Sequence, residues 1–142
     1  MNTVGIIANP ASGRDIRRLV AYGTVFDNQE KVNIVRRILL GLVAAQTRQV
    51  FFMPDYFGIV RQAVEGLSRT QPLPMEIRPA DICLTGTQID SAAAAAAMVE
   101  SGVDCIVTLG GDGTNRMVAK ECGDIPLIPV STGTNNVFSV MV

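Results

Sequence analysis

The sequence contains no histidine among its 142 residues, and its three cysteines lie far apart. Cys83, Cys105 and Cys122 form no CxxC pair, and isolated thiols without histidine lack the spacing of zinc ligands. The missing imidazole also removes the commonest general base, so acid–base chemistry falls to carboxylates or lysines. We therefore expect no metal site of this type and interpret the three cysteines as small buried apolar residues.

Long apolar runs and an excess of one charge are also missing. No stretch has the ~18–20 apolar residues that a membrane-spanning helix requires, and the alanine-rich residues 91–99 are better explained as a packed helix. The formal net charge of −1 gives no broad attraction to nucleic acid or to anionic lipid. The odd number of cysteines and the lack of a signal peptide favour a reducing cytoplasm. We expect a cytoplasmic protein whose partners include neither nucleic acid nor a membrane.

Three common site motifs are absent. Without G-x-x-x-x-G-K-[ST] the chain is not a P-loop enzyme. Without G-x-G-x-x-G after the first apolar run, a standard dinucleotide-binding dehydrogenase is disfavoured. The absence of G-x-S-x-G counts against an α/β-hydrolase.

Short apolar runs alternate with helix-like stretches, which is typical of βαβ units and a parallel sheet. Strands are expected at residues 4–8, 50–53, 75–77 with a second piece at 82–84, 103–109 and 125–130. Helices are expected at residues 16–21, 28–45, 55–67, 87–100 and 114–121, with a looser stretch at 22–27. The fold class is therefore α/β, a Rossmann-like three-layer parallel sheet with helices on both faces, forming one domain over residues 1–142.

Three loops rich in Gly, Ser, Thr and Asn each follow a buried apolar run, at residues 9–13, 110–114 and 131–136. In a parallel sheet all carboxyl ends of the strands lie at one edge, and ligands of open α/β sheets bind along that edge. We therefore expect the three loops to meet there and to form one composite site.

The middle loop, Gly110-Gly111-Asp112-Gly113-Thr114, leads from a strand into a helix. Glycines let main-chain N–H groups approach a ligand closely, and the first turn of the helix adds unpaired N–H groups and the positive end of the dipole. These features suit a phosphate. Asp112 would repel a bare phosphate, so it is expected to meet Mg²⁺ or to accept a proton from a hydroxyl. The alternative is a tight turn in which Asp112 only caps the helix.

With these loops assembled, the chain resembles the superfamily that joins ATP-NAD kinases with diacylglycerol and sphingosine kinases. The matching pieces are Asn9-Pro10-Ala11-Ser12-Gly13, the loop from Gly110 to Thr114, and Thr132-Gly133-Thr134-Asn135. Within the superfamily, residues 131–138 are most similar to the branch of the acetoin-catabolism X proteins. The resemblance implies an N-terminal α/β domain, a β-rich domain beyond residue 142, and a homo-oligomer in the full-length form.

The resemblance also implies a chemistry. It makes Asp112 the candidate base for the ribose 2′-hydroxyl of NAD, with ATP or another phosphoryl donor and Mg²⁺ as cofactors. The residues expected to bind these nucleotide ligands are Asn9, Ser12, Gly13, Gly110, Gly111, Gly113, Thr114, Thr132, Gly133, Asn135 and Asn136.

Two departures keep other functions open. Lipid kinases of the superfamily have an Asn-Glu pair soon after the glycine loop, where this chain has Asn115-Arg116. Their third loop ends in an acid, where this chain has Asn136 after an inserted Thr134. The leading hypothesis is an NAD kinase-like phosphotransferase. The alternatives are a catalytically silent nucleotide-binding regulator associated with acetoin catabolism and, more weakly, a lipid kinase.

Overall fold

The computed structural model describes residues 2–10 and 21–130 of the chain. Within them, five parallel strands form one sheet in the order β3-β2-β1-β4-β5. The strands are β1 (Thr3–Ala8), β2 (Gln49–Phe52), β3 (Glu76–Pro79), β4 (Cys105–Leu109) and β5 (Leu127–Val130). The helices are α1 (Ala21–Ala44), α2 (Ile59–Ser68), α3 (Ile89–Ser101) and α4 (Asp112–Glu121). This confirms the predicted α/β fold with a parallel sheet.

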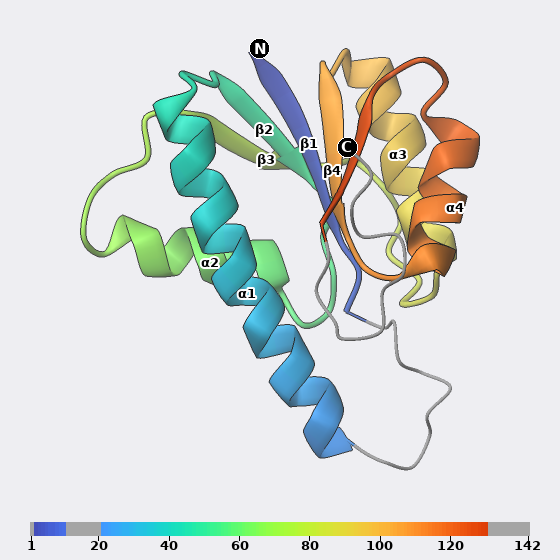
Figure 1. Ribbon diagram of the computed structural model, residues 1–142, viewed down its shortest axis with the longest axis horizontal. Helices are drawn as coiled ribbons and strands as arrows, with labels where there is room; N and C mark the ends of the chain where they lie inside the picture. The colour runs from blue at the N-terminus through green and yellow to red at the C-terminus, as the bar shows by residue number, and fades with distance from the viewer. Residues whose placement is uncertain (1, 11–20, 131–142) are drawn as a thin grey trace.

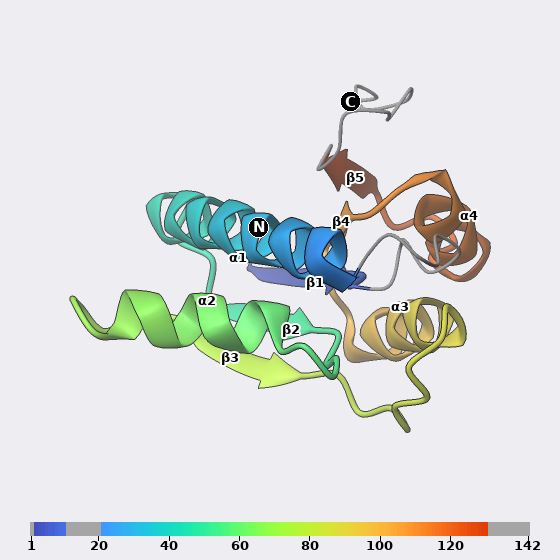
Figure 2. The same ribbon diagram turned by 90° about the horizontal axis from the view of Figure 1, so that it is seen from below.

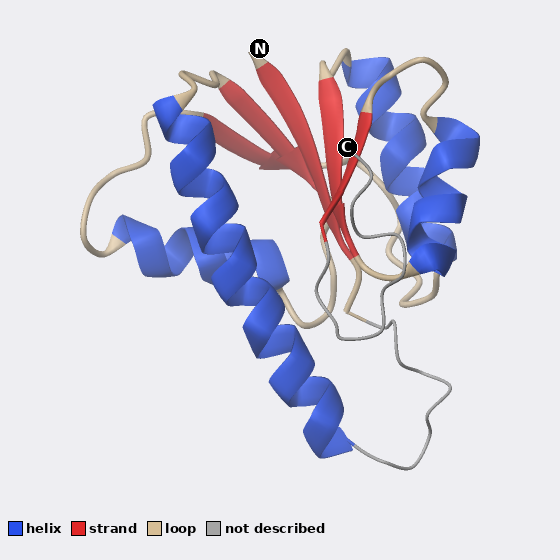
Figure 3. Cartoon of the chain, viewed as in Figure 1, coloured by secondary structure: helices blue, strands red, loops and turns tan. Residues whose placement is uncertain are grey.

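The sheet lies between two layers of helices. Figure 1 shows α1 and α2 on one side of the strands and α3 and α4 on the other, and Figure 2 shows the same separation after a quarter turn. Coloured by secondary structure, the strands form a single twisted layer between the two helical layers (Figure 3). The three-layer arrangement predicted from the sequence is therefore confirmed.

Alternation along β1 divides the core into two halves. Val4 and Ile6 are fully buried with α1 and α2, whereas Ile7 is buried with α3 and α4. Because successive side chains of a strand point to opposite faces, a strand covered on both faces is apolar throughout. This explains why the first apolar run shows no polar alternation.

Several predicted boundaries are wrong. The helix expected to begin at residue 28 begins at Ala21, so the looser stretch predicted at 22–27 is helical. Each residue added to an existing helix gains one hydrogen bond, and this outweighs the cost of about 1 kcal/mol for Gly23. In the part of the chain described, the second strand piece expected at 82–84 is not found, and α4 begins two residues earlier than predicted, at Asp112. Most of the short helix predicted at 16–21 lies outside the described residues.

The interpretation of the cysteines is right at two positions and wrong at one. Cys105 and Cys122 are buried in the core, but Cys83 is exposed. Cys83 follows β3 at the edge of the sheet, in a segment that is not a strand, so its flanking apolar residues do not place it in a core. No helix among the described residues is long and apolar enough to cross a membrane.

Candidate functional site

The strand order places a topological switch point between β1 and β4. The chain moves outward from β1 to β2 and β3, then returns to the other side of β1 with β4 and β5. Ligands of open α/β sheets bind outside the carboxyl ends of the strands at such a point. Here those ends lie side by side, because Ala8 pairs with Leu109 and the Asn9 N–H donates to the Leu109 carbonyl at 3.0 Å.

Two of the three predicted loops meet at this point. The Asn9 side-chain Nδ2 donates to Oγ1 of Thr114 at 2.8 Å, and both residues are buried. A second side-chain bond links β4 to α4, since Thr108 Oγ1 donates to Asn115 Oδ1 at 2.6 Å. The loop after β1 and the loop after β4 are therefore joined by side chains that are 105 residues apart in sequence.

The glycine loop is shaped by close contact on one side and open space on the other. A Cβ at Gly110 would lie 2.7 Å from Oγ1 of Thr114, so a side chain there would force Thr114 or the loop to shift. A Cβ at Gly111 would meet nothing within 4 Å. The absence of a side chain at Gly110 thus permits close packing against Thr114, while the space around Gly111 leaves the backbone of the loop accessible.

Asp112 is the first residue of α4 and is exposed. The N-cap residue is Gly111, which makes no side-chain cap hydrogen bond, so the alternative in which Asp112 is the N-cap is not what the structure has. A carboxylate in the first turn interacts favourably with the helix dipole. The exposed carboxylate therefore lies at the end of α4 whose backbone N–H groups are suited to an anion.

Lys31 is a feature of this region that sequence reasoning missed. It belongs to α1, is only 3% exposed, and its Nζ donates to the Asn9 carbonyl at 2.7 Å. Charged side chains are rarely buried to this extent unless they are paired or hydrogen-bonded. Its position within the helix gave no signal, because a lysine on an amphipathic helix is ordinarily on the solvated face. The bond brings a cation next to the carboxyl end of β1.

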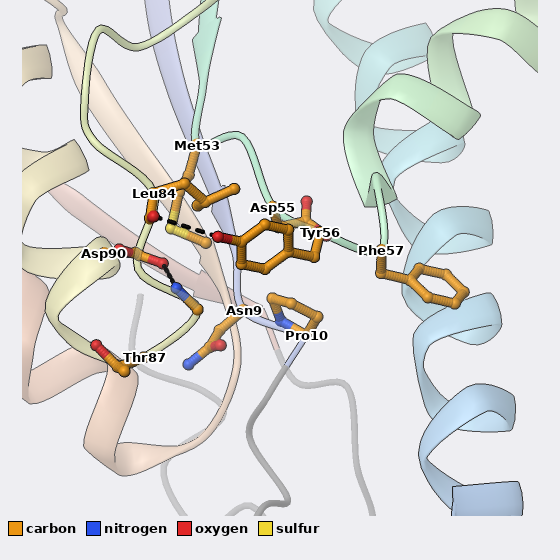
Figure 4. Close-up of a pocket in the computed structure, with 10 residues that line it drawn as sticks. Asn9, Pro10, Met53, Asp55, Tyr56, Phe57, Leu84, Thr87 and Asp90 are labelled. Carbon is orange, nitrogen blue, oxygen red and sulfur yellow. Dashed lines mark hydrogen bonds between the residues drawn. The ribbon is translucent and has the colours of Figure 1, made fainter.

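Asn9 also lines a pocket of about 290 Å³. Figure 4 shows it between the segment that follows β2 and the segment that leads into α3, with the Tyr56 ring lying across it and Phe57 pointing away from that ring. Its lining is mostly apolar, and the lining residues are Asn9, Pro10, Met53, Asp55, Tyr56, Phe57, Leu84, Gly86, Thr87 and Asp90. Asn9 alone of these was predicted as a site residue.

Two carboxylates hold the pocket walls in shape. Asp55 accepts from the Gly58 N–H at 2.7 Å and from the Ile59 N–H at 3.1 Å, so its carboxylate satisfies the first backbone donors at the start of α2. Burial raises the pKa of Asp55, and its backbone hydrogen bonds oppose the rise only in part. On the opposite wall the buried Asp90 accepts from the backbone N–H groups of Thr85 at 2.8 Å and Gly86 at 2.7 Å.

The structure does not describe all of the remaining predicted site residues. Six of them lie outside the described residues: Ser12, Gly13, Thr132, Gly133, Asn135 and Asn136. Arg116, which carries the departure from the lipid kinases, is exposed on α4.

Residues 4–142 match the family model of the ATP-NAD kinase N-terminal domain. Together with the parallel sheet and the glycine loop at its carboxyl edge, this match shows that the chain belongs to the ATP-NAD kinase family. The resemblance seen in the sequence is therefore confirmed.

One relative is the acetoin catabolism protein X of Cupriavidus necator strain H16. The two are 42% identical over an alignment of 142 positions, which covers 97% of this chain and 39% of the relative. The chain therefore spans well under half the length of that protein. No solved structure matches the chain.

Proposed function

We propose that the protein is a phosphotransferase that moves the γ-phosphoryl group of ATP to a hydroxyl, with the 2′-hydroxyl of NAD as the acceptor. The observation that carries the proposal is the hydrogen bond from Asn9 to Thr114, which holds the loop after β1 against the glycine loop that bears the exposed carboxylate of Asp112. Phosphoryl transfer depends chiefly on positioning and on electrostatic stabilisation, and this edge of the sheet offers both.

In this proposal Asp112 accepts the proton of the acceptor hydroxyl, and the oxygen of that hydroxyl attacks the γ-phosphorus. The bond from that phosphorus to the β–γ bridging oxygen breaks, and ADP leaves with the electron pair. The glycine loop holds the phosphates through its N–H groups. Mg²⁺ bound through the substrate phosphates and water would neutralise phosphate charge.

The proposal extends to the parts of the site outside the described residues. The loops at 12–13 and 132–136 would add contacts to the nucleotides, and a β-rich domain following residue 142 would close over the acceptor. We further propose that the full-length protein works in the cytoplasm as a homo-oligomer.

The test is NADP formation by the purified full-length protein with MgATP and NAD. We expect Asp112→Asn to lower turnover by about 10²- to 10⁴-fold, the usual contribution of a general base, while ATP binding persists. Asp124→Asn is the matched control, since Asp124 is exposed beyond the end of α4. Turnover of Asp112→Asn equal to that of the wild type would exclude Asp112 as the base.

A second candidate function is a nucleotide-binding regulator without turnover. It is favoured by Arg116, which is exposed where lipid kinases of the superfamily have an acid, and by Asn115, whose side-chain oxygen accepts from buried Thr108. Binding of ATP or NAD to the wild-type protein with no phosphorylated product in any condition would support the regulator over the enzyme.

A further inference from the structure

The buried face of α1 changes from apolar to polar along the helix. Val35 and Leu39 are fully buried in the core that includes β1. One and two turns earlier the buried residues are Lys31 and Asn28, which are 3% and 4% exposed. Residues three or four positions apart lie on the same face of a helix. The polar part of this face lies toward the N-terminal end of α1, which extends past the carboxyl ends of the strands (Figure 1).

Both polar residues carry a cost to stability. Lys31 has a charged group withdrawn from water, and replacing buried charges by apolar residues of similar volume is often neutral or stabilising. Asn28 has a buried Oδ1 without a hydrogen-bond partner among the described residues, and an unsatisfied buried acceptor is also unfavourable. A leucine at either position would continue the apolar face. Departures of this kind from good packing are typical of functional sites.

Lys31 reaches the first loop through its ammonium group. Its Nζ donates to the carbonyl oxygen of Asn9 at 2.7 Å, and Asn9 is itself only 3% exposed. Pro10 follows Asn9 and has no backbone N–H, so the peptide group between the two offers only its carbonyl oxygen for hydrogen bonding. Hydrogen bonds from a charged donor are stronger than those between neutral groups. Lys31 therefore anchors the first loop at its first residue.

The contact continues from Asn9 to the glycine loop. Asn9 Nδ2 donates to Thr114 Oγ1 at 2.8 Å, and a Cβ at Gly110 would lie 2.7 Å from the same oxygen. The Thr114 hydroxyl is thus in close contact with both loops. Because interiors packed this closely transmit small displacements, a shift of Asn9 would move Thr114 and the backbone of the glycine loop.

We propose that Lys31 is a positioning residue of the site at the carboxyl edge. It fixes Asn9, and through Asn9 and Thr114 it holds the glycine loop in the conformation that binds the phosphates of a nucleotide. The identification of these phosphates with those of ATP rests on the proposed function, whereas the chain of contacts does not. Alignment matters here because a misplacement of about 1 Å can lower a reaction rate by about 10²-fold.

The test uses the full-length protein with Lys31→Met, which keeps a long side chain but removes the charge and the donor. Calorimetry with MgATP and with inorganic tripolyphosphate should show affinities lower by about tenfold or more. The two losses should be similar, because tripolyphosphate has the phosphates without the base. Lys31→Gln, whose shorter side chain keeps a donor, should show a smaller loss of the same kind. It keeps the test available if Lys31→Met does not fold.

Val35→Ala is the control for a purely structural role. It removes apolar packing from the same face of α1, one turn further along, and leaves the bond to Asn9 in place. Thermal melting establishes that both variants are folded at the temperature of the titrations. Val35→Ala should then bind both ligands as the wild type does. Equal losses in Lys31→Met and Val35→Ala would overturn the proposal, as would wild-type affinity in Lys31→Met.

A double variant tests the route through Asn9. Lys31→Met and Thr114→Val remove the two ends of one chain of contacts, so their effects on affinity should not be independent. The double variant should lose less affinity for tripolyphosphate than the product of the two separate losses. A loss equal to that product would show that Lys31 does not act through Asn9 and would exclude the proposed role.

These outcomes are separable from those of the proposed function. Affinity for MgATP that depends on Lys31, without NADP formation, would retain the positioning role and exclude the enzyme. NADP formation with unchanged kcat and KM in Lys31→Met would exclude the positioning role and leave the enzyme. A wild-type protein that binds neither MgATP nor tripolyphosphate would contradict both proposals.

Discussion

Asn9 connects three parts of the molecule at the scale of single residues. Its backbone N–H bonds to β4, its carbonyl accepts from Lys31 of α1, and its side chain bonds to Thr114 of α4. An asparagine can make these bonds at once because its amide supplies both donors and an acceptor beyond those of the backbone. The first loop is therefore held in register with the glycine loop by a few buried polar contacts.

The first prediction concerns the bond between Asn9 and Thr114. Thr114→Val keeps the shape of the side chain but removes the acceptor of a buried hydrogen bond, which should cost about 1–3 kcal/mol of unfolding free energy. Chemical denaturation of the full-length protein measures the change. Thr70→Val is the control, because the Thr70 hydroxyl donates to Leu67 at an exposed position. A loss no greater than that of Thr70→Val would show that the bond does not hold the loops together.

The second prediction concerns acid stability. The backbone N–H groups of Thr3 and Asn2 donate to Asp104 and lower the pKa of its carboxyl below the ordinary 3.8. The folded protein therefore binds this proton less readily than the unfolded chain, so the stabilisation is present above pH 3.8 and is lost as the pH falls through the lowered folded-state value.

We accordingly expect Asp104→Asn to lose less stability than the wild type when the pH falls below 3.8. Thermal melting across that range provides the measurement, with Asp124→Asn as the control for removing an exposed carboxylate. An equal fall in melting temperature with pH for Asp104→Asn and the wild type would contradict this account of Asp104.

The sequence predicts those site residues whose residue type is unusual for their position. Asn9 and the residues from Gly110 to Thr114 are turn-forming or polar residues placed directly after buried strands, so their edge of the sheet could be predicted. Tyr56 and Asp90 could not, because the pocket that they line exists only where three separate segments meet. Lys31 was missed for a similar reason, since its partner is a backbone atom 22 residues away.

At the scale of elements, α3 lies close against β1 because the strand carries a glycine there. A Cβ at Gly5 would lie 2.5 Å from Sδ of Met98, a fully buried residue of α3. The alanine-rich residues 91–99 were expected to form a packed helix, and Ala94 and Ala95 of α3 are fully buried. The glycine on the strand completes that contact from the other side.

The third prediction tests this contact. Gly5→Ala should cost about 1–3 kcal/mol, because overpacking a filled core forces side chains or backbone to shift. Gly41→Ala is the matched control, since Gly41 is exposed in α1 with nothing within 4 Å of a Cβ. It should stabilise α1 by up to about 1 kcal/mol through helix propensity. Denaturation midpoints that move in the same direction for both variants would contradict this account of the packing.

The elements themselves were predictable from periodicity, while their ends were less so. Four of the five strands in the described residues coincide with apolar runs, whereas the edge strand β3 has the sequence EIRP and overlaps the predicted residues 75–77 only at Glu76 and Ile77. The early start of α1 at Ala21 was missed although Tyr22, Val25 and Phe26 have three- and four-residue spacing, because Gly23 and Asp27 are residues typical of turns. The start of α4 at Asp112 was missed because glycines ordinarily argue against a helix, and Gly113 lies in its first turn.

At the scale of the whole molecule, the sheet has two edges and only one of them is expected to bind nucleotide. The carboxyl edge bears Asn9, the glycine loop and the pocket with Tyr56. The opposite edge bears a second, more polar pocket that includes Arg48 and Glu76. The positive charge of Arg48 could attract a phosphate without any further recognition. Nucleotide binding at the two edges can therefore be compared within one protein.

Hydrogen exchange of the full-length protein with and without MgATP and NAD tests the central claim most directly. We predict slower exchange on nucleotide addition in the peptides that contain Asn9 and residues 110–114, with no change in the peptide that contains Arg48. The glycine-loop amides should be protected because they would donate to phosphate oxygens. Protection at Arg48 without protection at residues 110–114 would contradict a nucleotide site at the carboxyl edge of the sheet.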